Sequence, residues 1–449
     1  MSQIRTADFK GGIFPLHDIH GGKSLTSGIP IAKMPAPNIA VYPMSQHIGA
    51  PCVPTVKKGD RVLIGQEIGA MRGFVSAPVH ASVSGEVIAV EQRLAISGSP
   101  VLSVVVKNDH KDEWVSDITA RTQGEVVDLS PEDIRAIVKT SGIVGLGGAS
   151  FPTHIKISPP PDSPIDTIIV NGAECEPYLT SDHRIMLEMP EKIIGGVKLV
   201  MKAVGGVAKA VIAIENNKKD AIKLISGLVK PEHDISVAAL AVKYPQGSEK
   251  HLISSVTRRE VPSGKLPSAV GCIVLNAATA AAIYDAVYSG RPIIDTVMSA
   301  TGEVYRPGSF LVRTGTPMQE VVDYCGGFKR AATKVVSGGP MMGISLYDFS
   351  VPVVKSTSAL LALGDNVAGN AEATQCLRCG RCVDVCPMGL IPSVVNKLSV
   401  MQNWEGTDKY SALDCIECGS CSYVCPAKLN ITSNIRTAKR AVMSARKRS

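Results

Sequence analysis

Aromatic residues are scarce in this 449-residue chain, where Phe, Trp and Tyr together occupy 4% of positions. Long apolar runs are missing too, because the longest charge-free stretch, residues 266–284, is interrupted by Pro267 and Asn276. This pattern argues against a membrane-spanning helix. Residues 1–5 lack the apolar core of a secretory signal, so we expect a water-soluble, cytoplasmic protein. A hydrophobic content of 45% excludes a disordered or collagen-like chain.

Acidic residues are absent from residues 418–449, which carry seven basic residues, while the whole chain has a net charge of +7. The rest of the chain is therefore balanced, and a basic face for nucleic acid is not expected. The tail is either a solvated helix end or a surface for an acidic partner or anionic lipid. An apolar stripe at helical spacing predicts that this tail is a helix packed on its neighbours; its members are Ile431, Ile435, Ala438 and Val442.

Eight of the twelve cysteines form two copies of the pattern Cys-x-x-Cys-x-x-Cys-x-x-x-Cys-Pro, which begin at Cys376 and Cys415. Three thiolates within seven residues can hold one corner of an iron–sulfur cube, while the fourth, before proline, reaches the other cube. The spacing predicts two [4Fe–4S] clusters. One cluster would be held by Cys376, Cys379, Cys382 and Cys425, and the other by Cys415, Cys418, Cys421 and Cys386.

Zinc is the competing interpretation of these motifs, but zinc sites pair two Cys-x-x-Cys units and do not need the third cysteine and the proline. Disulfides are not expected in a chain without a secretory signal. The four remaining cysteines have no ligand spacing, and we interpret them as buried structural thiols. They are Cys52, Cys175, Cys272 and Cys325.

Residues 1–122 are rich in alternating Val and Ile residues with glycine turns, which predicts a small sandwich of short strands. The stretch resembles the barrel-sandwich fold of biotinyl and lipoyl domains. Because no lysine stands between Ala70 and Ala77, where that family carries its modified lysine, we expect an unmodified scaffold.

Residues 123–292 alternate helix and strand patterns, as in a Rossmann-like α/β domain. Ser130 and Pro131 predict the start of a helix, which leads into a glycine-rich loop at residues 142–152. Such a loop lets backbone approach a phosphate or a flat ring. Polar clusters then follow four apolar runs, near residues 171, 215, 244 and 276. Since ligands of open α/β sheets bind at the carboxyl ends of strands, these clusters predict one shared crevice.

Residues 293–350 return to short strands and turns, with Gly338 to Gly343 as a conspicuous turn. No residue pattern in this stretch indicates a catalytic site, so we expect a small domain whose role is to pack against its neighbours. Residues 351–449 then hold both cysteine motifs and the tail, as a ferredoxin-like domain. The predicted fold is therefore multidomain, with α/β and α+β parts.

The chain as a whole resembles the RnfC subunits of the Rnf electron-transport complexes, which are membrane-associated ferredoxin:NAD+ oxidoreductases. Related families include the FMN-carrying, NADH-oxidising subunit of respiratory complex I. The resemblance extends from Phe9 to the second cysteine motif. Its specific parts are residues 46–51, 76–85, 145–152, 171–178, 244–249 and 338–343, together with the cysteine repeat.

This resemblance implies that residues 123–292 bind FMN and NAD(H), and that residues 293–350 form an SLBB-type β-grasp module. On the flavin side it implies Gly145, Gly147, Gly148, Ala149, Asn171, Glu174, Asn276 and Thr279, with Lys156 near the phosphate. On the nicotinamide side it implies Glu176, Gly247 and Glu249, with Phe151 as a stacking surface.

By the same resemblance, the chain would be a peripheral subunit on the cytoplasmic face of the cell membrane. Its partners would be other Rnf-type subunits, with ferredoxin reached through one of them. A flavin can exchange a hydride with NAD+ and single electrons with clusters, so no catalytic acid or base is expected.

Two alternatives remain open. One is a soluble flavin and iron–sulfur reductase of another acceptor, such as a corrinoid. The other is a flavin-less electron-wire subunit, because Ala173 and Cys175 stand where the complex I pattern has an acidic residue and a glycine.

Overall fold

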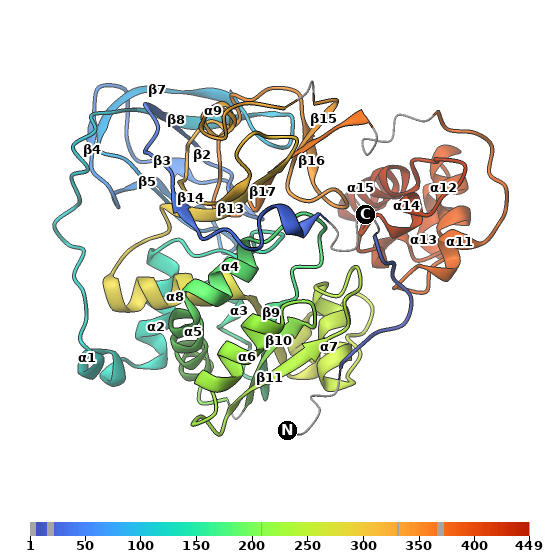
Figure 1. Cartoon of the computed structure of the whole chain (residues 1–449), viewed down its shortest axis with the longest axis horizontal. Helices are drawn as coiled ribbons and strands as arrows, with labels where there is room; N and C mark the ends of the chain where they lie inside the picture. Colours follow the sequence, from blue (N-terminus) through green and yellow to red (C-terminus); the bar gives the residue numbers. More distant parts are fainter. Residues whose placement is uncertain (1–5, 16–21, 208, 330–331, 366–371, 449) are drawn as a thin grey trace.

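The computed structural model describes residues 6–15, 22–207, 209–329, 332–365 and 372–448. Figure 1 shows β sheets in the upper part, an α/β part below them and a small helical lobe to one side. The N-terminal segment, in dark blue, runs from the α/β part to the helical lobe. Segments at opposite ends of the sequence therefore lie side by side.

The predicted sandwich of short strands is confirmed. Two antiparallel sheets enclose a core that contains Tyr42, Ile68 and Val87. One sheet has the order β2-β8-β7-β4, and the other has the order β3-β5-β6. The strands are β2 (Ile39–Pro43), β3 (Val53–Pro54), β4 (Arg61–Val62), β5 (Glu67–Ala70), β6 (Val79–His80), β7 (Gly85–Leu94) and β8 (Pro100–Asn108).

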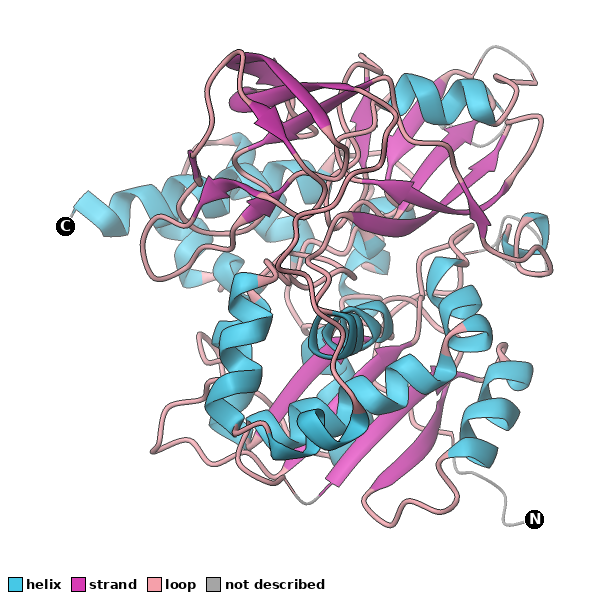
Figure 2. Cartoon of the chain, turned by 90° about the vertical axis from the view of Figure 1, so that its left-hand side faces the viewer, coloured by secondary structure: helices cyan, strands magenta, loops and turns pink. Residues whose placement is uncertain are grey.

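The α/β part is built on a parallel sheet with the order β11-β10-β9-β12. Successive residues of a strand face opposite sides, so Ile168 and Val170 enter one core while Ile169 enters another. Helices cover both faces (Figure 2). The strands are β9 (Thr167–Gly172), β10 (Lys209–Glu215), β11 (Ile235–Leu240) and β12 (Cys272–Asn276).

The helix start that the sequence predicts in this part is confirmed by α2. Ser130 caps α2 through a capping box with Asp133, and Pro131 is its first residue. The helices are α1 (Gln123–Asp128), α2 (Pro131–Thr140), α3 (Thr153–Lys156), α4 (Ser181–Glu188), α5 (Pro190–Ala203), α6 (Lys219–Leu228), α7 (Glu249–Thr257) and α8 (Ala277–Ser289), with 3₁₀ turns η1 (Lys23–Leu25) and η2 (Pro267–Val270).

Strand order locates the crevice of this sheet. The chain first builds outward from β9 through β10 to β11, and then returns to place β12 on the other side of β9. The segments that follow β9 and β12 therefore meet at the carboxyl edge of the sheet, where open α/β sheets bind ligands, and we call this edge the crevice. β9 ends with Asn171 and Gly172, and β12 ends with Asn276.

The third sheet is larger than the sequence predicts. The expected domain ends at residue 350, but β17 pairs with β13 and β15, so the sheet continues to Leu363. β1, from the N-terminal region, adds an edge strand beside β14. β1 has only two residues, which is too short to be recognised from local sequence. The elements are β1 (Ala32–Lys33), β13 (Asp295–Gly302), β14 (Gly308–Arg313), α9 (Met318–Tyr324), β15 (Lys334–Ser337), β16 (Ile344–Leu346) and β17 (Ala359–Leu363).

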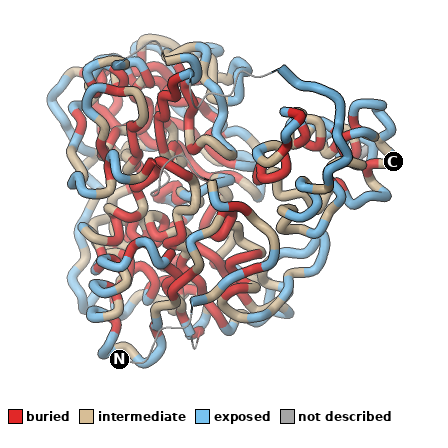
Figure 3. Tube along the Cα trace, turned by 45° about the vertical axis from the view of Figure 1, so that its right-hand side comes forward, coloured by how far each residue is buried: buried red, intermediate tan, exposed pale blue. Residues whose placement is uncertain are grey.

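The helical lobe carries both cysteine motifs and has its own small core (Figure 3). The predicted tail helix is confirmed, since all four members of its apolar stripe are buried. No helix in the described ranges is both long and apolar enough to cross a membrane. The elements are α11 (Arg381–Asp384), α12 (Pro392–Val400), α13 (Trp404–Lys409), η3 (Ala412–Asp414), α14 (Ser420–Tyr423) and α15 (Ile431–Arg448).

Candidate functional site

The glycine-rich loop between α2 and α3 contacts the junction of β12 and α8. Its base is fixed, because the Leu146 amide donates a 3.0 Å hydrogen bond to the Thr279 hydroxyl. Gly147 lies so close to Asn276 that an added Cβ would be 2.5 Å from the side-chain nitrogen. Gly148 and Ala149 are exposed, and a Cβ on Gly148 would meet nothing within 4 Å. The tip of the loop is therefore free to approach a ligand.

Asn276 connects two elements at the crevice. Its side-chain oxygen caps α8 by accepting a 2.8 Å hydrogen bond from the Ala278 amide. Its nitrogen donates a 2.6 Å hydrogen bond to the Asp182 carboxylate. Burial and the nearby Glu174 raise the pKa of Asp182 to about 7. The orientation of the Asn276 amide is thus set before any ligand arrives.

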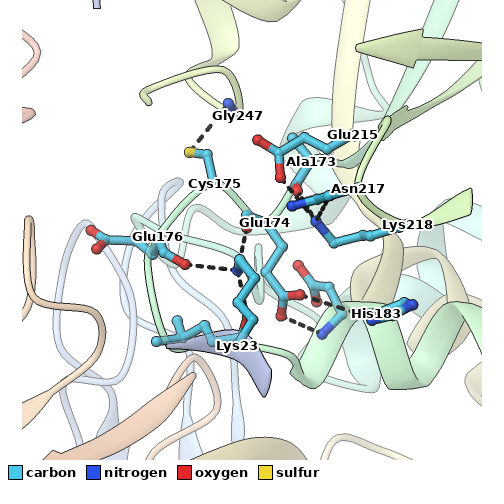
Figure 4. Close-up of polar contacts among 12 residues, drawn as sticks. Lys23, Ala173, Glu174, Cys175, Glu176, His183, Glu215, Asn217, Lys218 and Gly247 are labelled. Carbon is cyan, nitrogen blue, oxygen red and sulfur yellow. Dashed lines mark hydrogen bonds and ion pairs between the residues drawn. The ribbon is translucent and has the colours of Figure 1, made fainter. Parts of the chain in front are cut away.

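Glu174, a predicted flavin contact, caps a helix in the structure. Its carboxylate accepts hydrogen bonds from the amides of Asp182 (2.7 Å) and His183 (3.2 Å) at the start of α4 (Figure 4). An acidic group at this end of a helix is favoured by the helix dipole. Its role toward a flavin stays a prediction.

Two lysines hold the loop that follows β9, and Lys23 is the first of them (Figure 4). Its ammonium donates to the backbone carbonyls of Glu174 (2.9 Å), Glu176 (2.8 Å) and Leu179 (2.6 Å). Burial of this ammonium lowers the pKa of Lys23, and the carboxylate of Glu174 opposes that shift. Three carbonyls of one loop thus converge on a single cation.

Lys218 is the second lysine, and it donates to the Ala173 carbonyl at 2.6 Å and to the Glu215 carboxylate at 2.9 Å. Both side chains of this ion pair are 2% exposed. Burial disfavours the charge of Lys218, but the carboxylates of Glu215 and Glu174 outweigh it and raise the pKa of Lys218. Local sequence does not single out either lysine, because nothing near a lysine shows where its ammonium will lie.

Glu176 and Cys175 point to other neighbours. The Glu176 carboxylate accepts hydrogen bonds from the Met341 (3.0 Å) and Met342 (2.9 Å) amides, so it joins the crevice to the 338–343 turn. Burial raises the pKa of Glu176 to about 7 and that of the Cys175 thiol to about 12. The Cys175 sulfur accepts a 3.4 Å hydrogen bond from the Gly247 amide (Figure 4).

The remaining predicted residues meet on the α7 side of the crevice. Lys156 forms a 2.8 Å ion pair with Glu249 and also donates to the Val274 carbonyl at 3.0 Å. The Asn171 side chain donates to the Gly247 carbonyl at 2.8 Å. Four of the predicted cofactor residues therefore contact one another in pairs, Lys156 with Glu249 and Asn171 with Gly247. Within the glycine-rich loop, the Phe151 carbonyl accepts a 2.9 Å hydrogen bond from the Gly145 amide. Their roles toward FMN and NAD(H) stay predictions.

Four cysteines of the helical lobe line one cavity, and they are the four assigned to a single cluster, namely Cys386, Cys415, Cys418 and Cys421. Backbone amides point at two of the sulfurs, from Leu390 to Cys386 and from Glu417 to Cys415, each at 3.4 Å. Such N–H···S contacts are typical of iron–sulfur sites. The donor set of this cavity therefore fits a [4Fe–4S] cluster.

The other four motif cysteines do not line this cavity. Cys376 and Cys379 are exposed, whereas Cys425 is buried and belongs to the lobe core together with Cys382. Among the described residues, no three His, Cys, Asp or Glu side chains converge as ligands of a single metal ion.

The basic tail is used within the lobe. Arg436 and Lys439 form ion pairs with Glu417 at 2.6 and 2.8 Å, and Arg446 pairs with Asp408 at 2.7 Å. Arg440 is exposed. Three basic side chains of α15 are therefore paired within the cluster domain, and one of them, Arg446, is 61% exposed.

Family models match four successive parts of the chain. They are the RnfC barrel sandwich hybrid domain (residues 7–111), the Nuo51 FMN-binding domain (138–285), the SLBB domain (300–345) and the 4Fe-4S dicluster domain (375–429). An FMN-binding domain and a dicluster domain are thus present.

Curated relatives match nearly the whole chain. The C subunit of the Na+-translocating ferredoxin:NAD+ oxidoreductase complex of Acetobacterium woodii is 46% identical, over 99% of each chain. The C subunit of the proton-translocating complex of Clostridium ljungdahlii is 44% identical, over 96% of this chain and 93% of its own. A solved NAD+-reducing [NiFe]-hydrogenase is a distant neighbour, with 16% identity and a TM-score of 0.49 over 72% of this chain and 64% of its own. The chain belongs to the family of C subunits of ion-translocating (Rnf) oxidoreductase complexes.

Proposed function

We propose that this protein is the peripheral electron-transfer subunit of a membrane-bound, ion-translocating ferredoxin:NAD+ oxidoreductase. Electrons pass between two [4Fe–4S] clusters, FMN and NAD(H). The names of the relatives support the overall reaction, and the matched FMN-binding and dicluster domains support the cofactors.

One observation carries this proposal. The cavity lined by Cys386, Cys415, Cys418 and Cys421 adjoins the segment that carries Gly247, because the Tyr244 hydroxyl donates a 2.7 Å hydrogen bond to the Cys418 carbonyl. Cys418 and Tyr244 share a small apolar core with Cys175 from the loop after β9. A cluster in this cavity would therefore be a close neighbour of a flavin in the crevice.

The residues of the crevice would bind FMN and orient it. The exposed tip of the glycine loop offers backbone to a phosphate, and the fixed amide of Asn276 offers a hydrogen-bond donor to a ring. Bound FMN supplies the exchange between hydride transfer and single-electron transfer. The cations of Lys23 and Lys218 keep the loop after β9 rigid, so that ligand contacts are made without reordering it.

Partners and location follow from the family. We propose that the chain assembles with other Rnf-type subunits on the cytoplasmic face of the membrane, and that ferredoxin delivers electrons through a partner subunit. The exposed pair Cys376 and Cys379 supports this arrangement, since a cluster held there would be accessible to a partner.

The test is anaerobic purification followed by assays of iron, sulfide and released flavin, and then visible spectra with and without NADH. Full iron content, bound FMN and bleaching by NADH are expected. Full iron content without flavin and without bleaching, even after FMN is added, would contradict the nucleotide and flavin assignment. The protein would then be an electron wire.

A further inference from the structure

Two side chains join the flavin crevice to the cluster cavity, and both come from the segment between β11 and the first turns of α7. Tyr244 is 1% exposed, and its hydroxyl donates to the Cys418 carbonyl. His251 is 6% exposed, and its Nε2 lies 2.9 Å from the Pro387 carbonyl, next to Cys386. These carbonyls belong to two different loops that line the same cavity.

The tautomer of His251 follows from its partners. A carbonyl oxygen only accepts, so Nε2 carries the proton and donates to Pro387. Burial lowers the pKa of His251, which keeps the ring neutral, so Nδ1 accepts the hydroxyl proton of Ser248 at 3.1 Å. Ser248 lies between Gly247 and Glu249 in the predicted nicotinamide side. One neutral ring therefore bridges the crevice loop and the cluster loop.

The N-terminal segment locks this contact from the outside. Ile13 pairs with Tyr244 through two backbone hydrogen bonds of 2.8 and 2.9 Å, and the Gly12 amide donates to the Val385 carbonyl at 2.9 Å. Gly12 has φ of +80°, and an added Cβ would lie 2.6 Å from the Tyr244 carbonyl. Phe9 packs against the His251 ring, with 4.8 Å between ring centroids. Both bridging side chains are thus held in place from several sides.

We propose that Tyr244 and His251 are positioning residues that fix the cluster of Cys386, Cys415, Cys418 and Cys421 against the flavin crevice and tune its reduction potential. Each donor partly neutralises a backbone carbonyl oxygen on the rim of the cluster cavity. Without its donor, that carbonyl would leave an uncompensated partial negative charge near the cluster, which disfavours the reduced, more negative form, and in a buried site this effect is weakly screened. Removing either donor should therefore lower the potential of this cluster. The inference rests on the proposed function only for the identity of the neighbouring flavin.

The experiment uses the full-length holoprotein and the variants Tyr244→Phe, His251→Gln and His251→Ala. Tyr244→Phe removes only the hydroxyl, while His251→Gln keeps an amide N–H that can replace the Nε2 donor. Tyr410→Phe is the matched control, because it removes a tyrosine hydroxyl from the helical lobe that carries the cysteine motifs. Tyr410 is 46% exposed, whereas Tyr244 is buried. Anaerobic potentiometric titrations followed by EPR give the potential of each cluster, and iron content shows whether both are present.

The expected result is a lower midpoint potential for one cluster in Tyr244→Phe, with the other cluster unchanged and no shift in Tyr410→Phe. His251→Gln should lower the midpoint potential of the same cluster by less than His251→Ala does. The assignment is made in a Cys376→Ser background, where the shifted signal should persist. Unchanged potentials in both Tyr244→Phe and His251→Ala with full iron would overturn the proposal, as would a shift confined to the signal lost in Cys376→Ser.

If Tyr244→Phe loses iron, the proposal is judged from His251→Gln and His251→Ala instead. The criterion is again whether the midpoint potential of the one cluster shifts. Chemical reductants set the potentials in this titration, so its outcome does not depend on NADH or on bound flavin. Failure of the proposed function would appear as missing FMN and no bleaching by NADH. Failure of this inference would appear as unshifted cluster potentials.

Discussion

The Lys156 ammonium lies 2.8 Å from the Glu249 carboxylate, so two residues expected on different sides of the cofactor are paired with each other. Lys156 comes from α3 and Glu249 from the start of α7, and the pair closes the α7 side of the crevice. Both side chains are partly exposed, at 29% and 40%. The pair can therefore open when a phosphate offers Lys156 a different anion.

Lys156→Met should weaken FMN binding by about 10- to 100-fold, because a hydrogen bond to a charged group is worth about 1.5–3 kcal/mol. Stability should hardly change, since a partly exposed ion pair contributes about 0–1 kcal/mol. Fluorescence quenching of added FMN and thermal unfolding measure the two effects. Lys192→Met, which breaks the comparable ion pair with Asp285 in the same domain, should leave FMN binding intact. Equal losses in both variants would contradict the assignment.

Gly147→Ala and Gly148→Ala should separate packing from ligand approach. A methyl at Gly147 would strike Asn276, and overpacking of this kind costs about 1–3 kcal/mol. A methyl at Gly148 meets open space, so the free energy of unfolding should change little while flavin content falls. Thermal unfolding of flavin-free protein and released flavin are the two measurements. Full flavin content in Gly148→Ala would show that the loop tip does not touch the cofactor.

Lys218→Met should destabilise the protein by about 3–5 kcal/mol, because it leaves the buried carboxylate of Glu215 without its partner. The double variant Lys218→Met/Glu215→Leu should recover much of this loss, since a buried ion pair can be replaced by apolar side chains at small cost. Urea unfolding of the two variants and the parent provides the comparison. A double variant no more stable than the single one would mean that the bond to the Ala173 carbonyl matters more than the charge.

The contribution of Asp182 to the free energy of unfolding should fall as the pH rises from about 4 to 7. In the folded protein the pKa of Asp182 is raised to about 7 by burial and by Glu174, so the folded state binds a proton that the unfolded chain releases near pH 4. The contribution is fully present below the unfolded pKa and is lost as the pH rises through 7. Asp182→Asn resembles the protonated form and should flatten this decline, which thermal unfolding at several pH values would record. A decline as steep as in the parent would assign the effect to other groups, such as Glu176.

Local sequence patterns are sufficient to predict many of the strands and the cysteine ligand sets of this protein. Apolar runs predict the strands that carry Asn171 and Asn276 near their carboxyl ends, and the spacing of the cysteines predicts which four line the cavity. Long-range packing escapes such patterns. Nothing near Lys23 indicates that its ammonium crosses to a loop about 150 residues away, and nothing near β17 indicates which sheet it joins. Such contacts depend on how separate domains dock, which no local period records.

The last prediction concerns the fourth cysteine of each motif, which we expect to bind the cluster of the other motif. Cys386 belongs to the first motif in sequence but lines the cavity of the second, so Cys386→Ser should cost the cluster of Cys415, Cys418 and Cys421. The double variant Cys386→Ser/Cys418→Ser should therefore keep about half of the iron, because both changes strike one cluster.

Cys386→Ser/Cys376→Ser should lose nearly all of the iron, because each change strikes a different cluster. If each motif instead held its own cluster, the two double variants would exchange results. Iron analysis and EPR after anaerobic reconstitution distinguish these outcomes, and Cys325→Ser, at a buried thiol outside both motifs, is the control that should keep full iron. The ligand sets are thus decided by which pairs of substitutions are redundant, with no need to resolve the individual signals.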